Sequence, residues 1–143
     1  MSSSLITAIG AIVGALGLAA VVGTVLNRRS GVLQPSGKGS AAADFDVSGL
    51  GLSRTGPPVV HFSAVWCGPC AGVRRVVNQV CAELPGVAHV EIDMDANAAA
   101  ARRLSVLSLP TTFIFDADGQ QRYRTAGVPK AADLRRALQQ LLT

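Results

Sequence analysis

Two cysteines in the segment Cys67-Gly68-Pro69-Cys70 are the residues of this 143-residue chain whose types and spacing most favour chemistry. Residues three apart lie about one helical turn from each other, at a Cα separation of about 5 Å that a disulfide tolerates. A chain that has only three cysteines and enough apolar residues for its own core does not need disulfides as staples. The pattern therefore predicts redox or metal chemistry at Cys67 and Cys70.

A zinc site is the alternative use of such a cysteine pair, and it needs two further ligands. The candidates are Cys81, His61 and His89, but Cys81 lies eleven residues beyond Cys70 on the same expected helix, about 16 Å away. The sequence contains no second Cys-x-x-Cys. We therefore expect neither a metal nor another cofactor, and we interpret Cys81 as a small residue of an apolar helix face and His89 as an ordinary strand residue.

The cysteine pair stands between an expected strand and an expected helix. Residues 57–64 (PPVVHFSA) form an apolar, β-branched run that leads directly into the pair. After it, apolar residues recur at helical spacing opposite a solvated face that carries Arg74 and Arg75, and Pro85-Gly86 ends the pattern. The apolar positions are Val73, Val76, Val77, Val80, Cys81 and Leu84. Cys67 would thus lie at the N-terminus of a helix, where free N–H groups and the helix dipole favour a thiolate.

These positions predict different roles for the two sulfur atoms. The Cys67 thiolate attacks a partner disulfide, a mixed disulfide forms, and Cys70 displaces the reduced partner to leave a Cys67–Cys70 bond. Gly68 keeps the turn small enough for a partner chain to approach, and Pro69 suits an early helical position because its missing N–H is not needed there. The expected partners are disulfide-containing proteins, together with a thiol reductant or a reductase that restores the dithiol.

The remainder of the sequence alternates strands and helices. Three further strands are expected at residues 87–93, 111–115 and 120–125, the last two joined by a turn at residues 116–119 (DADG). Helices are expected at residues 96–104 and 131–142. This order predicts an α/β fold with a mixed sheet and helices on both faces, whose first two strands are parallel through a right-handed crossover.

Two segments resemble the signature segments of the thioredoxin family, residues 62–70 (FSAVWCGPC) and 108–115 (SLPTTFIF), with 43 residues from Cys67 to Pro110. The resemblance covers residues 57–142 and implies a thioredoxin-like fold and a thiol-disulfide oxidoreductase that reduces protein disulfides. It implies a cis Leu109–Pro110 bond beside the cysteines and pairing of the Leu109 backbone with an extended substrate segment. It also implies an apolar docking surface to which Trp66, Pro69 and Gly127 contribute.

The chain departs from the family pattern close to the expected site. Thioredoxins usually carry a buried Asp six residues before the first cysteine, and this chain has His61 there. Its imidazole either takes the general-base role for Cys70 or is a structural residue hydrogen-bonded within the sheet. Glu91 stands where many members have a lysine, Ser63 stands where many have a second Trp, and residues 45–56 leave little room for the usual first strand and helix. These differences bear on substrate range and redox poise rather than on the exchange chemistry.

The N-terminal segment is uncharged from Leu5 to Leu26, and these 22 residues would span roughly 33 Å as a helix, enough to cross a bilayer. A cleaved signal peptide is the alternative, although residues 1–4 carry no basic side chain and the apolar run is longer than about 15 residues. We expect a transmembrane anchor at residues 1–26, a flexible linker rich in Gly, Ser and Pro at residues 27–43, and a thioredoxin-like domain at residues 44–143.

Charge is distributed unevenly along the chain, whose net charge is +4. Before residue 44 there are three basic residues, Arg28, Arg29 and Lys38, and no acidic one, whereas ten basic and nine acidic residues follow. The nearly neutral domain does not favour a nucleic-acid partner. Because Arg28 and Arg29 directly follow the apolar run, we expect a single-pass protein of the cell membrane with its domain on the cytoplasmic side.

Two alternative functions differ from the expected membrane-anchored, cytoplasmic disulfide reductase. In the first, the domain lies outside the membrane and exchanges disulfides of exported proteins or in cytochrome maturation. In the second, the chain is a thioredoxin-like docking module that binds partners without turnover. The presence of both cysteines favours an enzyme over a docking module.

Overall fold

The computed structural model describes residues 3–37 and 56–143 of the chain, which divides into two units at Ser30 and Gly31. The first unit contains the helix α1 (Ser3–Arg28), a 26-residue helix whose only charged residue is Arg28. The length and composition of α1 suffice to cross a membrane, and a signal sequence near the N-terminus would have the same properties.

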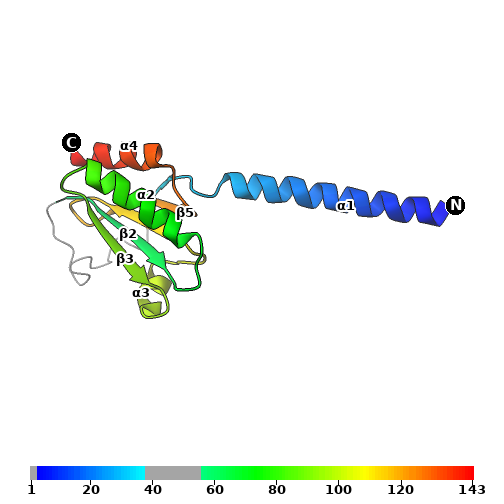
Figure 1. The fold of residues 1–143 in the computed structure, drawn as a ribbon, viewed down its shortest axis with the longest axis horizontal. Coiled ribbons are helices and arrows are strands. Elements are labelled where there is room, and N and C mark those ends of the chain that lie inside the picture. Colours follow the sequence, from blue (N-terminus) through cyan, green and yellow to red (C-terminus); the bar gives the residue numbers. More distant parts are fainter. Residues whose placement is uncertain (1–2, 38–55) are drawn as a thin grey trace. The chain divides into compact units, whose positions relative to one another are not determined.

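The second unit is built on a five-stranded mixed sheet with the strand order β1-β5-β4-β2-β3 (Figure 1). The strands are β1 (Gln34–Pro35), β2 (Pro58–Ser63), β3 (Ala88–Asp93), β4 (Thr111–Phe115) and β5 (Gln121–Ala126). The helices are α2 (Cys70–Glu83), α3 (Ala98–Arg103) and α4 (Ala131–Leu142). Strands β2 and β3 are parallel, as the order of the elements predicts, and the other pairs are antiparallel.

The helices cover both faces of the sheet, which confirms the expected layers. Figure 1 shows α2 and α4 together over one face and α3 on the opposite side. Alternate residues of β2 and β4 therefore point into two separate hydrophobic cores: Val59 and Ile114 pack under α2 and α4, whereas Val60 and Phe113 pack on the side of α3. Strands β2 and β4 are buried along their whole length, so β2 places the residues that follow it at a fixed edge of the sheet.

Residues 31–36, expected as part of a flexible linker, belong instead to the folded domain. The Gly31 N–H donates to the Ala126 carbonyl at 2.6 Å, the Ser36 N–H donates to the Arg122 carbonyl at 2.9 Å, and β1 pairs antiparallel with β5 between them. Leu33 packs against the core under α2 and α4. A two-residue strand that contains a proline has no periodicity by which the sequence could reveal it. The rest of the expected linker, residues 38–43, and the expected start of the domain at residues 44–55 lie outside the described residues.

Candidate active site

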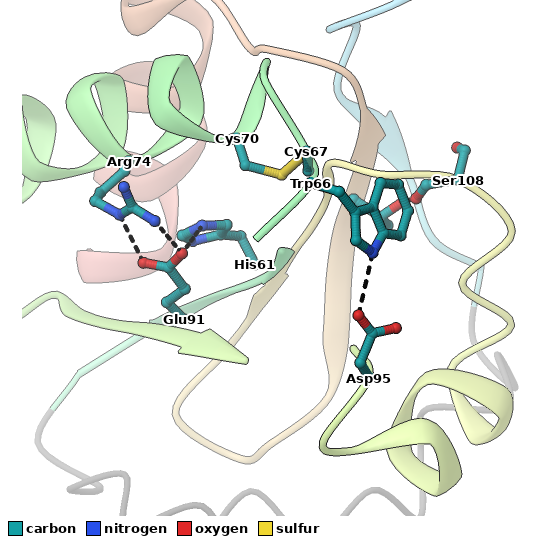
Figure 2. The surroundings of a disulfide bond; sticks show 9 residues. His61, Trp66, Cys67, Cys70, Arg74, Glu91, Asp95 and Ser108 are labelled. Carbon is teal, nitrogen blue, oxygen red and sulfur yellow. Dashed lines mark hydrogen bonds and ion pairs between the residues drawn. A yellow bond between two sulfur atoms is a disulfide. The ribbon is translucent and has the colours of Figure 1, made fainter. Parts of the chain in front are cut away.

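Cys67 and Cys70 form a disulfide with a Cα separation of 5.5 Å, at the point where β2 gives way to α2 (Figure 2). The intervening chain is a tight turn in which the Cys67 N–H donates to the Ala64 carbonyl at 3.0 Å and the Cys70 N–H to the Cys67 carbonyl at 3.3 Å. Cys70 is only 2% exposed, whereas Cys67 is half-buried. The two sulfur atoms therefore differ in access: a partner can approach Cys67, and Cys70 is shielded.

The N-terminus of α2 is electrostatically suited to an anion at Cys67. The helix begins at Cys70 with Pro69 at the N-cap, so Cys67 lies just before its first turn. The first turn of α2 contains no acidic residue, and the N-cap makes no side-chain hydrogen bond. The positive end of the helix dipole is thus left without a compensating carboxylate, which favours a thiolate at Cys67 once the disulfide is reduced.

The loop that enters β4 brings Pro110 into this region, and the Leu109–Pro110 bond is cis, as the family resemblance implies. The Thr111 hydroxyl donates to the Ser108 carbonyl at 2.7 Å and fixes the turn before the strand. Behind the proline, the Gly127 N–H donates to the Pro110 carbonyl at 2.9 Å. Gly127 has a φ of 89°, a backbone conformation that glycine adopts without strain. The loops before β4 and after β5 are therefore tied together.

Trp66 lies beside the disulfide with 64% of its surface exposed (Figure 2). Its indole N–H donates to the Asp95 carboxylate at 3.1 Å, which holds the ring in a defined orientation. The adjoining Val65 is 94% exposed, and Leu107, in the loop before Pro110, is 91% exposed. Contiguous exposed apolar surface is typical of sites that bind other proteins, and Trp66 with the adjoining Val65 supplies such surface beside the disulfide. Sequence reasoning identified Trp66 but not Asp95 or Leu107, because no local pattern marks either residue.

His61 is fully buried in β2 and has a histidine partner on the neighbouring strand. Its Nδ1 atom lies 2.8 Å from Nε2 of His89, and the two rings are stacked with centroids 4.9 Å apart. Nδ1 of His89 in turn lies 2.9 Å from Oδ1 of Asn78 on α2. With the Asn78 carbonyl accepting the His89 N–H, the His89 Nε2 accepts the Nδ1–H of His61, and Nε2 of His61 carries a lone pair. His89 is therefore more than the ordinary strand residue that the sequence indicates.

An ion pair flanks the two histidines. Arg74 donates to both carboxylate oxygens of Glu91, at 2.7 and 2.5 Å, and the nearer oxygen of Glu91 to His61 lies 3.6 Å from its Nε2. Arg74 belongs to the face of α2 expected to be solvated and is half-exposed, but its fork-shaped guanidinium has this specific partner. Glu91 stands opposite His61 in the parallel register of β2 and β3, which confirms that the two residues are neighbours.

The pKa values of these groups follow from burial and pairing. Burial, with a further contribution from repulsion by His89, lowers the pKa of His61 from 6.5 to about 4. Burial also lowers the pKa of His89. Hydrogen bonds from Arg74 lower the pKa of the Glu91 carboxyl to about 2. At neutral pH this cluster therefore consists of two neutral imidazoles beside a charged Arg74–Glu91 pair.

A buried strand, a turn that places one accessible and one buried cysteine at the start of a helix, and a neighbouring cis-proline loop define a dithiol-disulfide oxidoreductase. Within residues 3–37 and 56–143, no three His, Cys, Asp or Glu side chains are grouped so as to hold a metal ion. The bonded pair of Cys67 and Cys70 at the start of α2 supports thiol chemistry.

Comparison with known proteins identifies the family. The thioredoxin family model matches residues 42–140, and the chain belongs to the thioredoxin family. It is 40% identical to a thioredoxin of Mycolicibacterium smegmatis over 101 residues, which is 68% of this chain and 88% of the relative. It is 37% identical to a thioredoxin of Chlamydia trachomatis over 86 residues, 60% of this chain and 76% of the relative.

Solved structures agree with this assignment. Chloroplastic thioredoxin z matches with a TM-score of 0.57 and 35% identity, over 62% of this chain and 80% of the other. A thioredoxin variant from Halobacterium salinarum matches with a TM-score of 0.55 and 32% identity, over 61% of this chain and 75% of the other. The protein is a thioredoxin-type thiol-disulfide oxidoreductase whose redox pair is Cys67 and Cys70.

Proposed function

We propose that the protein is a membrane-tethered reductase of protein disulfides in which Cys67 is the nucleophile and Cys70 the resolving residue. The observation that carries the roles of the two cysteines is their unequal burial, with Cys67 half-buried and Cys70 only 2% exposed. A partner disulfide reaches Cys67 from solvent, whereas Cys70 reaches only the sulfur of Cys67. The pair then transfers two electrons, and a thiol reductant or a reductase must restore the dithiol.

The exchange takes place in two steps, each of which forms one sulfur–sulfur bond and breaks another. The Cys67 thiolate attacks one sulfur of the substrate disulfide, and the other substrate sulfur leaves as a thiolate. Cys70 then loses its proton and attacks Cys67 in the mixed disulfide, which forms the Cys67–Cys70 bond and releases the second substrate thiolate. The exposed Gly68 and Pro69 leave room for the partner chain during the first step.

The surroundings of the disulfide supply a docking surface for an extended partner segment. Trp66 offers an exposed apolar ring that its bond to Asp95 orients. The half-buried Leu109 would pair through its backbone with the partner segment, while Pro110 and Gly127 shape the loops on which the segment lies. Backbone pairing gives affinity without demanding one sequence, so this arrangement suits substrates with varied side chains around their disulfides.

His61 is the candidate proton acceptor for Cys70. Its imidazole is neutral at pH 7, its Nε2 has no hydrogen-bond partner among the described residues, and the Glu91 carboxylate 3.6 Å away would stabilise the imidazolium. A base with a pKa of about 4 holds a thiol proton only transiently, so the contribution to rate is expected near or below the lower limit of about 10²-fold usual for general bases. In a His61→Gln variant the slowed step should be resolution by Cys70, measured as accumulation of mixed disulfide; an unchanged resolution rate would make His61 purely structural.

The exchange mechanism is tested by trapping. In a Cys70→Ser variant the first step still occurs but the second does not, so covalent adducts between Cys67 and substrate proteins should accumulate. Non-reducing electrophoresis of cell extracts, followed by mass spectrometry of the adducts, measures this and identifies the substrates. The double variant with both cysteines replaced by serine is the matched control, because it has no sulfur at the site. Adducts equally abundant in the control, or no adducts in Cys70→Ser, would contradict the mechanism.

The membrane topology rests on α1 and on Arg28 and Arg29, which directly follow its apolar run. Basic residues at the end of a span are retained on the cytoplasmic side, so the catalytic domain is proposed to face the cytoplasm. A maleimide that does not cross membranes should fail to label Cys67 in intact cells and label it after permeabilisation. Labelling in intact cells would place the domain outside and favour exchange with exported proteins or cytochrome maturation.

A further inference from the structure

The chain that follows α1 is bonded to the catalytic domain from Gly31, its third residue. Besides the backbone bonds that Gly31 and Ser36 make to β5, the Gln121 amide donates to the Ser36 hydroxyl, and Leu33 packs into the core. These contacts bind both ends and the middle of the segment 31–36. Any slack in the connection to α1 must therefore lie before Gly31.

Gly31 occupies a position that requires glycine. It is buried with a φ of 79°, and a Cβ atom added to it would collide with the Val128 carbonyl oxygen. Gly37, six residues later, is exposed and has nothing within 4 Å of the same hypothetical atom. The close approach at Gly31 thus marks a specific contact between two backbones, the chain leaving the anchor and the loop after β5.

The contacted loop is part of the active site. Gly31 bonds to Ala126, the residue before Gly127, and Gly127 bonds to the carbonyl of Pro110 at 2.9 Å. Val128 packs on the first turn of α2, where a Cβ at Gly72 would lie 3.3 Å from its side chain. Gly72 is two residues beyond Cys70. Gly31, the first residue of the folded unit, therefore lies at the end of the sheet where the disulfide lies.

Chain length bounds the distance between anchor and domain in any orientation. Only two residues, 29 and 30, lie between Arg28 at the end of α1 and Gly31. The Cα atoms of Arg28 and Gly31 therefore cannot be more than about 11 Å apart, at 3.8 Å per residue. A flexible linker over the whole of residues 27–43 would have allowed on the order of 25 Å. A folded domain of this size is about 35 Å across. With so short a connection, the catalytic domain cannot move far from the bilayer surface at which α1 would end.

We propose that strand β1, by fixing residues 31–36 to the catalytic domain, shortens the connection to α1. Among membrane-bound substrates, the enzyme is thereby restricted to proteins whose disulfides lie close to the bilayer surface. This inference rests on the proposed membrane anchoring. Reach, rather than sequence recognition, then selects the substrate class: disulfides in juxtamembrane segments of integral or lipid-anchored proteins have a high effective concentration at Cys67, and disulfides held far above the membrane have almost none. Freely diffusing disulfides are not excluded, because they can come to the site.

The test uses the full chain in vesicles of phosphatidylcholine and phosphatidylglycerol, reduced beforehand and freed of reductant so that a single turnover is observed. Two transmembrane peptides carry the same disulfide-closed loop, one directly after the helix and the other on a spacer of 20 prolines, about 60 Å long. The near loop should be reduced at least about tenfold faster than the far loop. A 30-residue Gly-Ser insertion between Ser30 and Gly31 adds about 30 Å of r.m.s. reach and should bring the two rates within about twofold.

Two glycine variants distinguish the effect of the β1 contacts from the effect of chain length, because neither variant changes the length of the chain. Gly31→Ala should displace the segment 31–36 and raise the rate on the far loop, whereas the matched Gly37→Ala should behave as the unmodified protein. The insertion lies outside the contacts of the domain, so it tests the proposal even if Gly31→Ala does not fold. Equal rates on both loops for the unmodified protein, or no effect of the insertion, would overturn the inference. A soluble peptide disulfide should be reduced equally by the unmodified protein, the insertion variant and Gly37→Ala; failure of the unmodified protein to reduce it would overturn the proposed function itself.

Discussion

Replacement of Cys67 by serine is expected to lower the rate of disulfide reduction by about 10³-fold or more, because a hydroxyl does not ionise near neutral pH and forms no mixed disulfide. Turnover of a fluorescence-quenched peptide disulfide, with a small thiol as electron donor, measures the effect. The geometry gives the reason for so large a loss: Cys70 is 2% exposed and cannot replace Cys67 as the attacking residue.

Cys81→Ser is the matched control for this experiment. Cys81 is a free, half-buried cysteine of α2 that packs against the core, and burial raises the pKa of its thiol. A buried, protonated thiol does not take part in exchange, so Cys81→Ser should keep its turnover within about twofold of the unmodified protein. Full activity in Cys67→Ser would contradict the proposed mechanism and favour a docking role without turnover.

The second large effect is a loss of stability on mild acidification. His61 is fully buried, and its pKa of about 4 in the folded state lies below the 6.5 of an unfolded chain. Above pH about 6.5 the imidazole is neutral in both states; below it the unfolded state gains a proton that the folded state cannot bind. The free energy of unfolding should therefore fall by about 2 kcal/mol between pH 7.5 and 5 from His61 alone. Burial of His89 acts in the same direction.

Urea unfolding monitored by the fluorescence of Trp66, the only tryptophan of the chain, at several pH values between 7.5 and 5 measures this slope. The Glu91 carboxyl does not interfere, because its contribution to stability is lost only as the pH falls from its unfolded pKa of 4.5 to its folded pKa of about 2. His61→Gln should flatten the slope whatever its stability at pH 7.5. A slope that is unchanged in His61→Gln would show that the His61 imidazole binds a proton as readily in the folded state as in the unfolded state, contrary to the burial described for it.

The elements around the active site could be predicted from sequence because each has a local physical signal. The β-branched run before Cys67 and the helical repeat from Val73 to Leu84 identify β2 and α2, and the segment from Ser108 to Phe115 carries the family resemblance that implies the cis bond at Pro110. Alternation in residues 87–93 likewise identifies β3, which places Glu91 opposite His61. These predictions rest on short-range patterns that tertiary contacts then reinforce.

What the sequence does not reveal depends on contacts between distant residues. In the sequence, His89 is an ordinary residue of a strand and Arg74 an ordinary residue of a helix face. Tertiary packing brings His89 to His61 and Arg74 to Glu91. The pairing of β1 with β5 joins residues ninety positions apart, Gln34 and Arg124. The composition of residues 27–43 predicts a flexible linker, and no short-range pattern in the sequence indicates that part of it pairs with β5.

The central claim is that Cys67, at the N-terminus of α2, is an accessible thiolate in the reduced protein. The rate of its alkylation by iodoacetamide as a function of pH, followed by mass spectrometry of the reduced protein, tests this most directly. Half-maximal reactivity at Cys67 should occur well below the value of about 8.5 of a free thiol, with Cys70 and Cys81 unmodified at the same pH. Alkylation of Cys67 that follows the pH profile of an ordinary thiol, or Cys70 reacting first, would contradict the account.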